Sequence, residues 1–281
     1  MLLTLITNEV DLARRAEAAG IDRIMIDLER KGKAQRQAGR NLFLSDHAWD
    51  DVDLIHGAID RAQLHVRINP WHQDSPREVD QAISSGANIV MLPMIRELDD
   101  VRHFLGAVNG RVRTSLLVET GGGLNQANEL TTIKGIDEIH IGLNDLAIDL
   151  RRTVIFEVLC ERMLDPAAAA CHRAGITFGF GGVACGSAKP LPISPELILA
   201  EQARLKSDIG LLGRSFRCLC KAASPEQLAG DVRWIRETLK QWRDADLAAY
   251  EENLSRLRTE VDAWKKSAAP TARSSDIRNF P

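Results

Sequence analysis

The sequence predicts an α/β protein with the (β/α)8, or TIM barrel, fold and an extra C-terminal helix. Eight short apolar runs that are typical of buried parallel strands recur along the 281 residues, and stretches with helical periodicity separate most of them. The repeat averages about thirty residues, which suits a closed barrel of about 250 residues better than an open doubly wound sheet. The first strand–helix turn also lacks the dinucleotide-binding glycine pattern.

The strand-like runs follow helix ends in a repeated order. They begin near Leu2, Arg23, Leu64, Asn88, Arg113, Ile136, Ile176 and Ile209. The phrases AEAAGIDRIMID and AISSGANIVMLP both pass from a helix end through a glycine to a buried strand. Ser75 and Pro76 open the helix after the third strand with residues that favour the first turn. These signals predict repeated strand–helix units.

The predicted barrel domain covers residues 1–245, and residues 246–266 form one more helix. One face of that helix carries an apolar seam of Leu247, Tyr250, Leu254, Leu257, Val261 and Trp264. Because the eighth barrel helix should already complete the wall, we expect the seam to pack on another subunit of a symmetric homo-oligomer. The competing arrangement folds this helix back on its own barrel. Residues 267–281 are expected to be disordered.

Composition favours a reduced cytoplasmic protein that recognises a small molecule. A net charge of −3 provides no field to attract nucleic acid or an anionic membrane, so we expect neither partner. The apolar N-terminal run lacks a basic region before it and a cleavage site, and it is predicted to be the first strand. Five cysteines show no zinc-binding spacing, which favours free thiols.

Two of the predicted strands end in carboxylates. Glu119 follows a run from Ser115, and Asp145 lies in the loop after the next strand, about one strand–helix–strand unit further on. In a parallel barrel both would lie at the edge where active sites occur. Two such carboxylates repel each other unless a cation or a proton is shared, which favours a hard divalent cation. The alternative is that both acids cap helices and bind no metal.

The other predicted strand ends add charged groups to the same edge. Asp27 and Glu29 follow the second strand, and Arg67 follows the third. An arginine beside a metal site can bind a substrate carboxylate or an enolate oxygen with its fork of donors. Arg67 could instead be a buried partner of Asp27 that only connects two strands.

The motifs DLE, VRINP, GANIVMLPM, LLVET and GLNDL, in this order, resemble the HpcH/HpaI aldolase and citrate lyase β-subunit family. The resemblance covers roughly residues 2–216 and implies a metal-dependent (β/α)8 barrel of the phosphoenolpyruvate/pyruvate type that makes or breaks a carbon–carbon bond. It implies that Glu119 and Asp145 bind Mg²⁺ or Mn²⁺ and that Arg67 stabilises an enolate. Asp27 and Glu29 match the family's acidic residues, and the backbone amides of the turn at Gly121, Gly122 and Gly123 would meet a substrate carboxylate or phosphate.

Two positions depart from the family pattern, and one of them differs from both branches. Arg30 replaces the histidine base of the pyruvate-aldolase branch, and Leu117 replaces a glutamine of that branch. The citrate-lyase branch has DLED where this chain has DLER. Arg30 could bind an extra carboxylate of a larger acceptor. His47 and His72 lie in loops near the same edge and could replace the missing base, although loop histidines are more often solvated.

The last two predicted strands add candidates with structural alternatives. The glycine-rich segment 179–187 could bind phosphate or could only relieve crowding in a turn. Cys185 within it could be a nucleophile, but no predicted base accompanies it, so an inert thiol is favoured. Arg214 and Ser215 could line the pocket, or the arginine could form an ion pair that closes the barrel.

The sequence therefore predicts a metal-dependent carbon–carbon lyase (aldolase) or condensing enzyme. Its substrate would be a 2-oxo acid such as pyruvate or oxaloacetate, or an acyl-CoA, and catalysis would pass through an enolate. The alternative is a non-catalytic or repurposed barrel that binds a carboxylated or phosphorylated metabolite.

Overall fold

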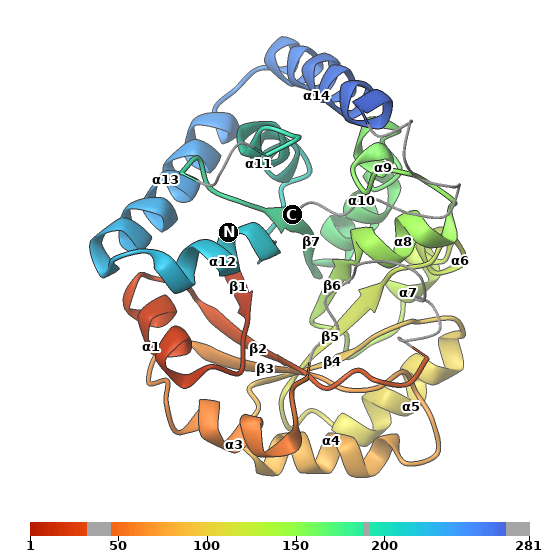
Figure 1. Cartoon of the computed structure of the whole chain (residues 1–281). Coiled ribbons are helices and arrows are strands. Elements are labelled where there is room, and N and C mark those ends of the chain that lie inside the picture. Colours follow the sequence, from red (N-terminus) through yellow and green to blue (C-terminus); the bar gives the residue numbers. More distant parts are fainter. Residues whose placement is uncertain (33–45, 188–190, 268–281) are drawn as a thin grey trace.

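Eight parallel strands close into a barrel in the computed structural model, which describes residues 1–32, 46–187 and 191–267. Each strand pairs with its sequence neighbours, and β8 pairs with β1. The strands occupy the centre of Figure 1, and the helices surround them. They are β1 (Leu2–Ile6), β2 (Arg23–Asp27), β3 (Gln63–Arg67), β4 (Ile89–Leu92), β5 (Arg113–Val118), β6 (Glu138–Ile141), β7 (Thr177–Val183) and β8 (Ile209–Leu212). The predicted barrel is confirmed.

The main core lies between the strands and the surrounding helices. Alternate strand residues such as Ile24, Val66 and Leu116 point outward into this layer and are fully buried. A smaller apolar cluster of Met25, Met91 and Leu117 forms separately. This alternation lets the remaining strand residues be polar and reach the barrel interior or its rim.

The helices connect successive strands and cover the barrel. They are α1 (Val10–Ala18), α3 (Trp49–His56), α4 (Ser75–Ser84), α5 (Leu98–Val108), α6 (Gly121–Asn125), α7 (Ala127–Leu130), α8 (Leu143–Asp149), α9 (Glu157–Cys160), α10 (Asp165–Ala174), α11 (Pro195–Arg204), α12 (Arg214–Ala222), α13 (Pro225–Arg243) and α14 (Leu247–Ser267). Gly20 follows the end of α1 with a φ of +96, a backbone conformation that glycine adopts easily, as the sequence predicted for the residue between helix and strand.

No helix within the described ranges is long and apolar enough to cross a membrane.

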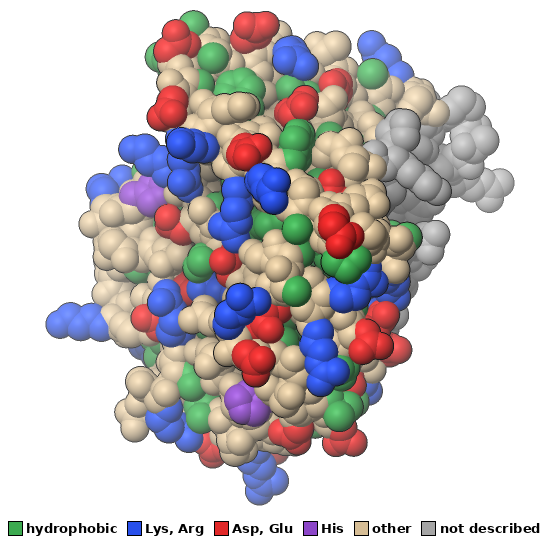
Figure 2. Space-filling model, turned by 90° about the vertical axis from the view of Figure 1, so that its left-hand side faces the viewer, with side chains coloured by type: hydrophobic (Ala, Val, Ile, Leu, Met, Phe, Trp, Pro, Cys, Tyr) green, Lys and Arg blue, Asp and Glu red, His purple; other side chains and the backbone are tan. Residues whose placement is uncertain are grey.

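The surface carries both charge signs. On the face shown in Figure 2, Lys and Arg side chains are interspersed with Asp and Glu side chains, and hydrophobic side chains are scattered among them. This mixture agrees with the small net charge of −3. Ligand recognition must therefore depend on local groups.

The C-terminal helix α14 packs on its own barrel, against α11 and α9. Leu254, Leu257 and Val261 of the predicted seam are buried there, with exposed fractions of 0–2%. Polar contacts fix the same arrangement, because Glu260 accepts hydrogen bonds from the Ser194 backbone N–H (2.7 Å) and hydroxyl (2.9 Å). The expectation that this seam packs on another subunit is thus corrected in favour of the fold-back arrangement. Homo-oligomerisation itself stays a prediction.

The wrong assignment has a simple physical reason. A seam shows that a helix needs an apolar partner but does not show which surface supplies it. Here the outer faces of α11 and α9 supply it, with Lys265 Nζ also donating to Glu157 Oε2 at 2.7 Å. The expected disordered tail, residues 267–281, lies outside the described residues apart from Ser267, which ends α14.

We expect Leu257→Ala to lower the free energy of unfolding by about 2–5 kcal/mol, because it leaves a cavity at a fully buried site. Urea unfolding followed by circular dichroism would measure the change. Leu247→Ala is the matched control, since Leu247 is 73% exposed and its loss should cost less than about 0.5 kcal/mol. Equal stability of the two variants, or a loss that depends on protein concentration, would contradict packing within one chain.

Candidate active site

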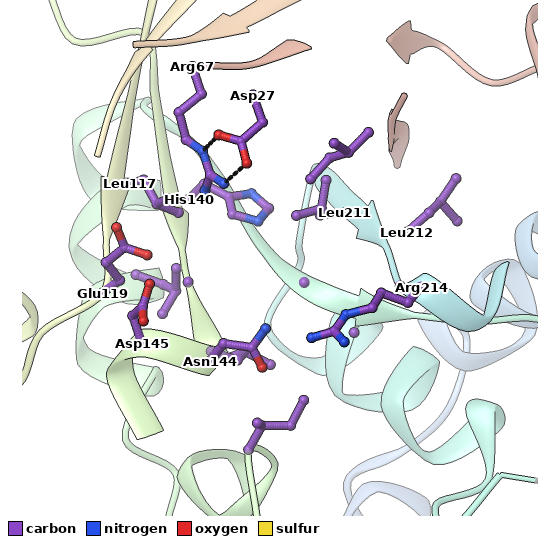
Figure 3. Close-up of a pocket in the computed structure, with 18 of the residues that line it drawn as sticks. Asp27, Arg67, Leu117, Glu119, His140, Asn144, Asp145, Leu211, Leu212 and Arg214 are labelled. Carbon is purple, nitrogen blue, oxygen red and sulfur yellow. Dashed lines mark hydrogen bonds and ion pairs between the residues drawn. The ribbon is translucent and has the colours of Figure 1, made fainter. Parts of the chain in front are cut away.

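A cavity opens at the carboxyl ends of the barrel strands. Parallel strands all end on this side, so side chains that directly follow them converge on one rim. Figure 3 shows Glu119 and Asp145 on one side of the cavity, Arg67 and Asp27 above them, and Arg214 on the opposite side. The structure thus brings together most of the charged residues that the sequence predicted for the site.

Glu119 is held in place by tight packing around its side chain. It follows β5, is 3% exposed and accepts a hydrogen bond at Oε1 from the Met94 backbone N–H at 3.1 Å. Met94 adopts a left-handed conformation (φ 52) that is uncommon for a residue with a side chain. A Cβ atom on Gly142 would lie 2.8 Å from Glu119 Oε2, so only glycine leaves the carboxylate this space.

Asp145 stands beside Glu119 from the neighbouring strand unit. It lies in the first turn of α8, three residues after the N-cap Gly142, and is 8% exposed. The two carboxylate groups lie next to each other in Figure 3. Both also line a second depression next to Arg96 and Gly122. The predicted pairing of these two acids at one edge of the barrel is therefore present in the structure.

Arg67 forms a two-pronged ion pair with Asp27 across β2 and β3. Its Nε and Nη2 donate to the two Asp27 carboxylate oxygens at 2.8 and 2.7 Å, and Glu29 Oε2 lies 3.6 Å from Nε. Burial alone would lower the pKa of Arg67, but the negative charges of Asp27 and Glu29 outweigh burial and raise it. Arg67 thus connects two strands through Asp27 and also lines the cavity, and its role toward a substrate stays a prediction.

The oxygen donors fit a hard divalent cation. The described parts of the chain hold no group of three or more His, Cys, Asp or Glu side chains placed as metal ligands, so Glu119 and Asp145 would act as a pair. Magnesium suits such a pair, because it commonly binds one or two carboxylates and takes its other ligands from water or substrate. Figure 3 also places Asn144, an amide that could offer a further oxygen, beside Asp145.

A family model for HpcH/HpaI aldolase/citrate lyase matches residues 1–184. The chain belongs to this family. The matched region contains Asp27, Arg67, Glu119 and Asp145. Membership of this family supports an activity as an aldolase or lyase.

Individual relatives agree with the family assignment. A 4-hydroxy-4-methyl-2-oxoglutarate aldolase of Hapsidospora irregularis is 25% identical over 64% of this chain and 74% of its own length. An HpcH/HpaI aldolase from Desulfitobacterium hafniense has a similar fold, with a TM-score of 0.59, 12% identity and coverage of 98% and 95% of the two chains. A citrate lyase β subunit from M. tuberculosis, complexed with oxaloacetate and magnesium, gives a TM-score of 0.56, 16% identity and coverage of 86% and 96%.

Several residues singled out by the HpcH/HpaI resemblance do not line the cavity. The Arg30 side chain is exposed and donates to the His47 carbonyl at 2.9 Å. The Gly121 N–H donates to Asp149 Oδ2 at 2.8 Å, so in this structure it is engaged within the chain, whereas Gly122 and Gly123 line the second depression. Glu29 is buried behind Arg67. Residues 33–45, which form much of the long link 30–51, lie outside the described residues.

The two histidines considered as replacement bases also lie elsewhere. His47 is not a solvated loop residue but is fully buried, and its Nδ1 accepts the Asp27 backbone N–H at 3.0 Å. Burial lowers its pKa. His72 contacts Ser75 and Glu78 at the start of α4. Neither histidine lines the cavity, although His47 supports the backbone of Asp27.

His140 is a site residue that the sequence reasoning missed. It is an inward-facing residue of β6, is 4% exposed and lines the cavity. Burial, together with the nearby cations Arg67 and Arg23, lowers the pKa of His140 to about 3. The alternation Glu138, His140, Gly142 along an otherwise apolar strand could have revealed this inward position.

The remaining candidates divide between the cavity and the core. Gly181 and Gly182 of the glycine-rich segment line the cavity, as does Arg214. Cys185 is fully buried and does not line it. An inert thiol remains the better interpretation of this cysteine.

We expect acid to destabilise the protein partly through His140. The unfolded state binds a proton near pH 6.5 but the folded state only near pH 3, so the free energy of unfolding falls as the pH drops below about 6.5. Between pH 7.5 and pH 5.5, the free energy of unfolding should therefore fall by about 1 kcal/mol less in the His140→Gln variant than in the unmodified protein. Urea unfolding of both proteins at these pH values measures the difference, and identical losses would contradict a neutral buried imidazole.

Proposed function

We propose that this protein is a divalent-metal-dependent aldolase that cleaves or forms a carbon–carbon bond next to a 2-oxo acid. The observation that carries the proposal is the pair of buried carboxylates, Glu119 and Asp145, beside Arg67 in one cavity. The names of its relatives support the substrate class, since one is a 4-hydroxy-4-methyl-2-oxoglutarate aldolase and another is a protein complexed with oxaloacetate and magnesium.

Glu119 and Asp145 would hold the cation, which is Mg²⁺ or Mn²⁺ in this proposal. When bound, the cation supplies positive charge that stabilises an enolate. Arg67 adds to this effect, because its bonds to Asp27 use two of its five N–H groups and leave others to donate to the substrate oxygens. Glu29 acts through Arg67 by holding it in position.

Asp27 is the proposed proton carrier. It is the acid on β2 that lines the cavity, whereas Glu29 does not. Asp27 would take the hydroxyl proton during cleavage and return it during condensation, directly or through a water molecule. Its ion pair with Arg67 at 2.7 Å would couple this proton transfer to the charge that develops on the enolate.

Metal removal tests the function directly. The exchange of the pyruvate methyl protons for deuterium can be monitored by NMR. We expect this exchange to stop when a chelator removes the metal and to resume when Mg²⁺ or Mn²⁺ is added back. Glu119→Gln should weaken metal binding by at least about 100-fold, since it removes one of two charged ligands. Glu129→Gln, at an exposed site on α7, is the control. Exchange that persists in metal-free protein would refute the proposal.

The same exchange measurement distinguishes the aldolase from the alternative function. In the alternative, the protein is a non-catalytic barrel that binds a carboxylated or phosphorylated metabolite. Arg30 and Leu117 motivate it, because they replace polar groups expected in the pyruvate-aldolase branch. Metal-dependent binding of pyruvate or oxaloacetate by calorimetry, without any proton exchange, would favour this alternative. The proposed cytoplasmic location and homo-oligomeric state are separate predictions.

Gly142→Ala tests the packing that positions Glu119. The new methyl group would lie 2.9 Å from Glu119 Cβ and must displace it, so we expect metal affinity to fall about 10- to 100-fold while the barrel stays folded. Titration with Mn²⁺ followed by electron paramagnetic resonance gives the affinity. Gly106→Ala, where nothing lies within 4 Å, is the matched control. Unchanged affinity in Gly142→Ala would show that Glu119 is not a ligand.

A further inference from the structure

Polar side chains line the interior of the barrel below the cavity, where the proposed chemistry does not use them. In a barrel of eight tilted strands, the inward-facing residues form layers of four that come from alternate strands. The residue at the same level on the next strand lies one position beyond the register partner. This step leads from Thr4 around all eight strands and back to Thr4. It defines a middle layer that consists of Thr4, His65, Ser115 and Gly179.

The layers above and below the middle layer come from the even-numbered strands. In the layer below, Arg23 donates to the two Glu138 carboxylate oxygens at 2.8 and 2.7 Å, so these two charges satisfy each other. The layer above separates the middle layer from the cavity and consists of Met25, Met91, His140 and Leu211. The middle layer is thus enclosed on both sides.

The polar atoms of the middle layer have no bonding partner among the described residues. Thr4 Oγ1, Ser115 Oγ and both ring nitrogens of His65 make no hydrogen bond there, although these three residues are at most 2% exposed. In the layer above, Nε2 of His140 is also buried and without a partner in the described part of the chain. Buried polar groups are nearly always hydrogen-bonded, because an unbonded one loses its hydration without compensation. These atoms therefore indicate a common partner.

The composition of the middle layer leaves space for such a partner. Barrel layers are usually filled by four side chains, most of them bulky. Gly179 contributes no side chain, and a Cβ atom there would lie 2.3 Å from the Ile209 carbonyl oxygen. Two of the other three side chains, Thr4 and Ser115, are small.

The charges around the middle layer favour a neutral partner. Arg23 and Arg67 both act on His65 and would repel a cation, while the charge of Arg23 is already balanced by Glu138. Burial, together with these arginines and His140, lowers the pKa of His65 well below its ordinary value. A neutral imidazole needs one hydrogen-bond acceptor and one donor, and a hydroxyl can play both roles. Water donates and accepts, and it is bound inside proteins where two to four polar groups surround it.

We propose that the middle layer binds ordered water, which bridges Thr4, His65 and Ser115 and also reaches Nε2 of His140. The His140 ring lines the cavity and lies beside Arg67 (Figure 3). The hydrogen bond that one ring nitrogen makes determines which nitrogen carries the proton. The water therefore fixes the tautomer that His140 presents to the cavity. This site does not depend on the proposed function, since it needs neither metal nor substrate.

A high-resolution crystal structure of the unmodified protein tests the water site. We expect density for water about 2.7–3.2 Å from Thr4 Oγ1, Ser115 Oγ and one His65 nitrogen. A crystal soaked in bromide should show no anomalous peak at this position. Density that is absent from the middle layer would overturn the proposal, and a bromide peak would do so as well, because it would identify an anion site.

Ser115→Ala tests the connection between the water and His140. The variant removes one partner of the water, so we expect the NMR signals of the His140 ring nitrogens to shift and oxygen relaxation dispersion to report fewer long-lived waters. Thr4→Val, which keeps the shape of the side chain, should act in the same direction and serves if Ser115→Ala does not fold. Ser84→Ala, at an exposed site on α4, is the matched control and should change neither measurement. His140 signals that stay unchanged in both middle-layer variants would refute the connection.

Discussion

The rim of the barrel gathers four buried carboxylates and one arginine. Asp27, Glu29, Glu119 and Asp145 are each 2–8% exposed, and Arg67 pairs with the first two of them. Like charges in a poorly solvated site repel each other, so this arrangement favours further positive charge close to the acids. The tight packing of Glu119 against Gly142 and the left-handed Met94 keeps its carboxylate at the place where that charge would sit.

The Arg67–Asp27 pair is better explained by positioning than by stability. Removing two charges from water costs about as much as their attraction returns, so such a pair contributes little net stability. The register of β2 and β3 sets Asp27 directly opposite Arg67, and the two parallel hydrogen bonds fix the plane of the guanidinium. An arginine held in this way can present its remaining donors in one direction, toward the cavity.

The sequence predicted the barrel and the paired acids because both depend on local signals. Apolar runs mark the strands, and a parallel barrel then determines that Glu119 and Asp145 share a rim. Contacts between distant segments could not be read in this way. The helix α14 contacts Ser194 and Glu157, and the buried His47 accepts a hydrogen bond from the backbone of Asp27, twenty residues earlier in the chain. His140 was missed because a histidine inside a barrel strand has no motif of its own.

The neutral state of His140 bears on how the cavity orients a ligand. Burial and the nearby Arg67 and Arg23 lower the pKa of His140 to about 3, so the imidazole carries no charge near neutral pH. A charged imidazole would add a further attractive position for an anion inside the cavity. With a neutral ring, the cationic side chains that line the cavity are its arginines Arg67, Arg214 and Arg217. A ligand oxygen close to the His140 ring would then meet a neutral hydrogen-bonding partner, whereas a ligand carboxylate would be attracted to an arginine.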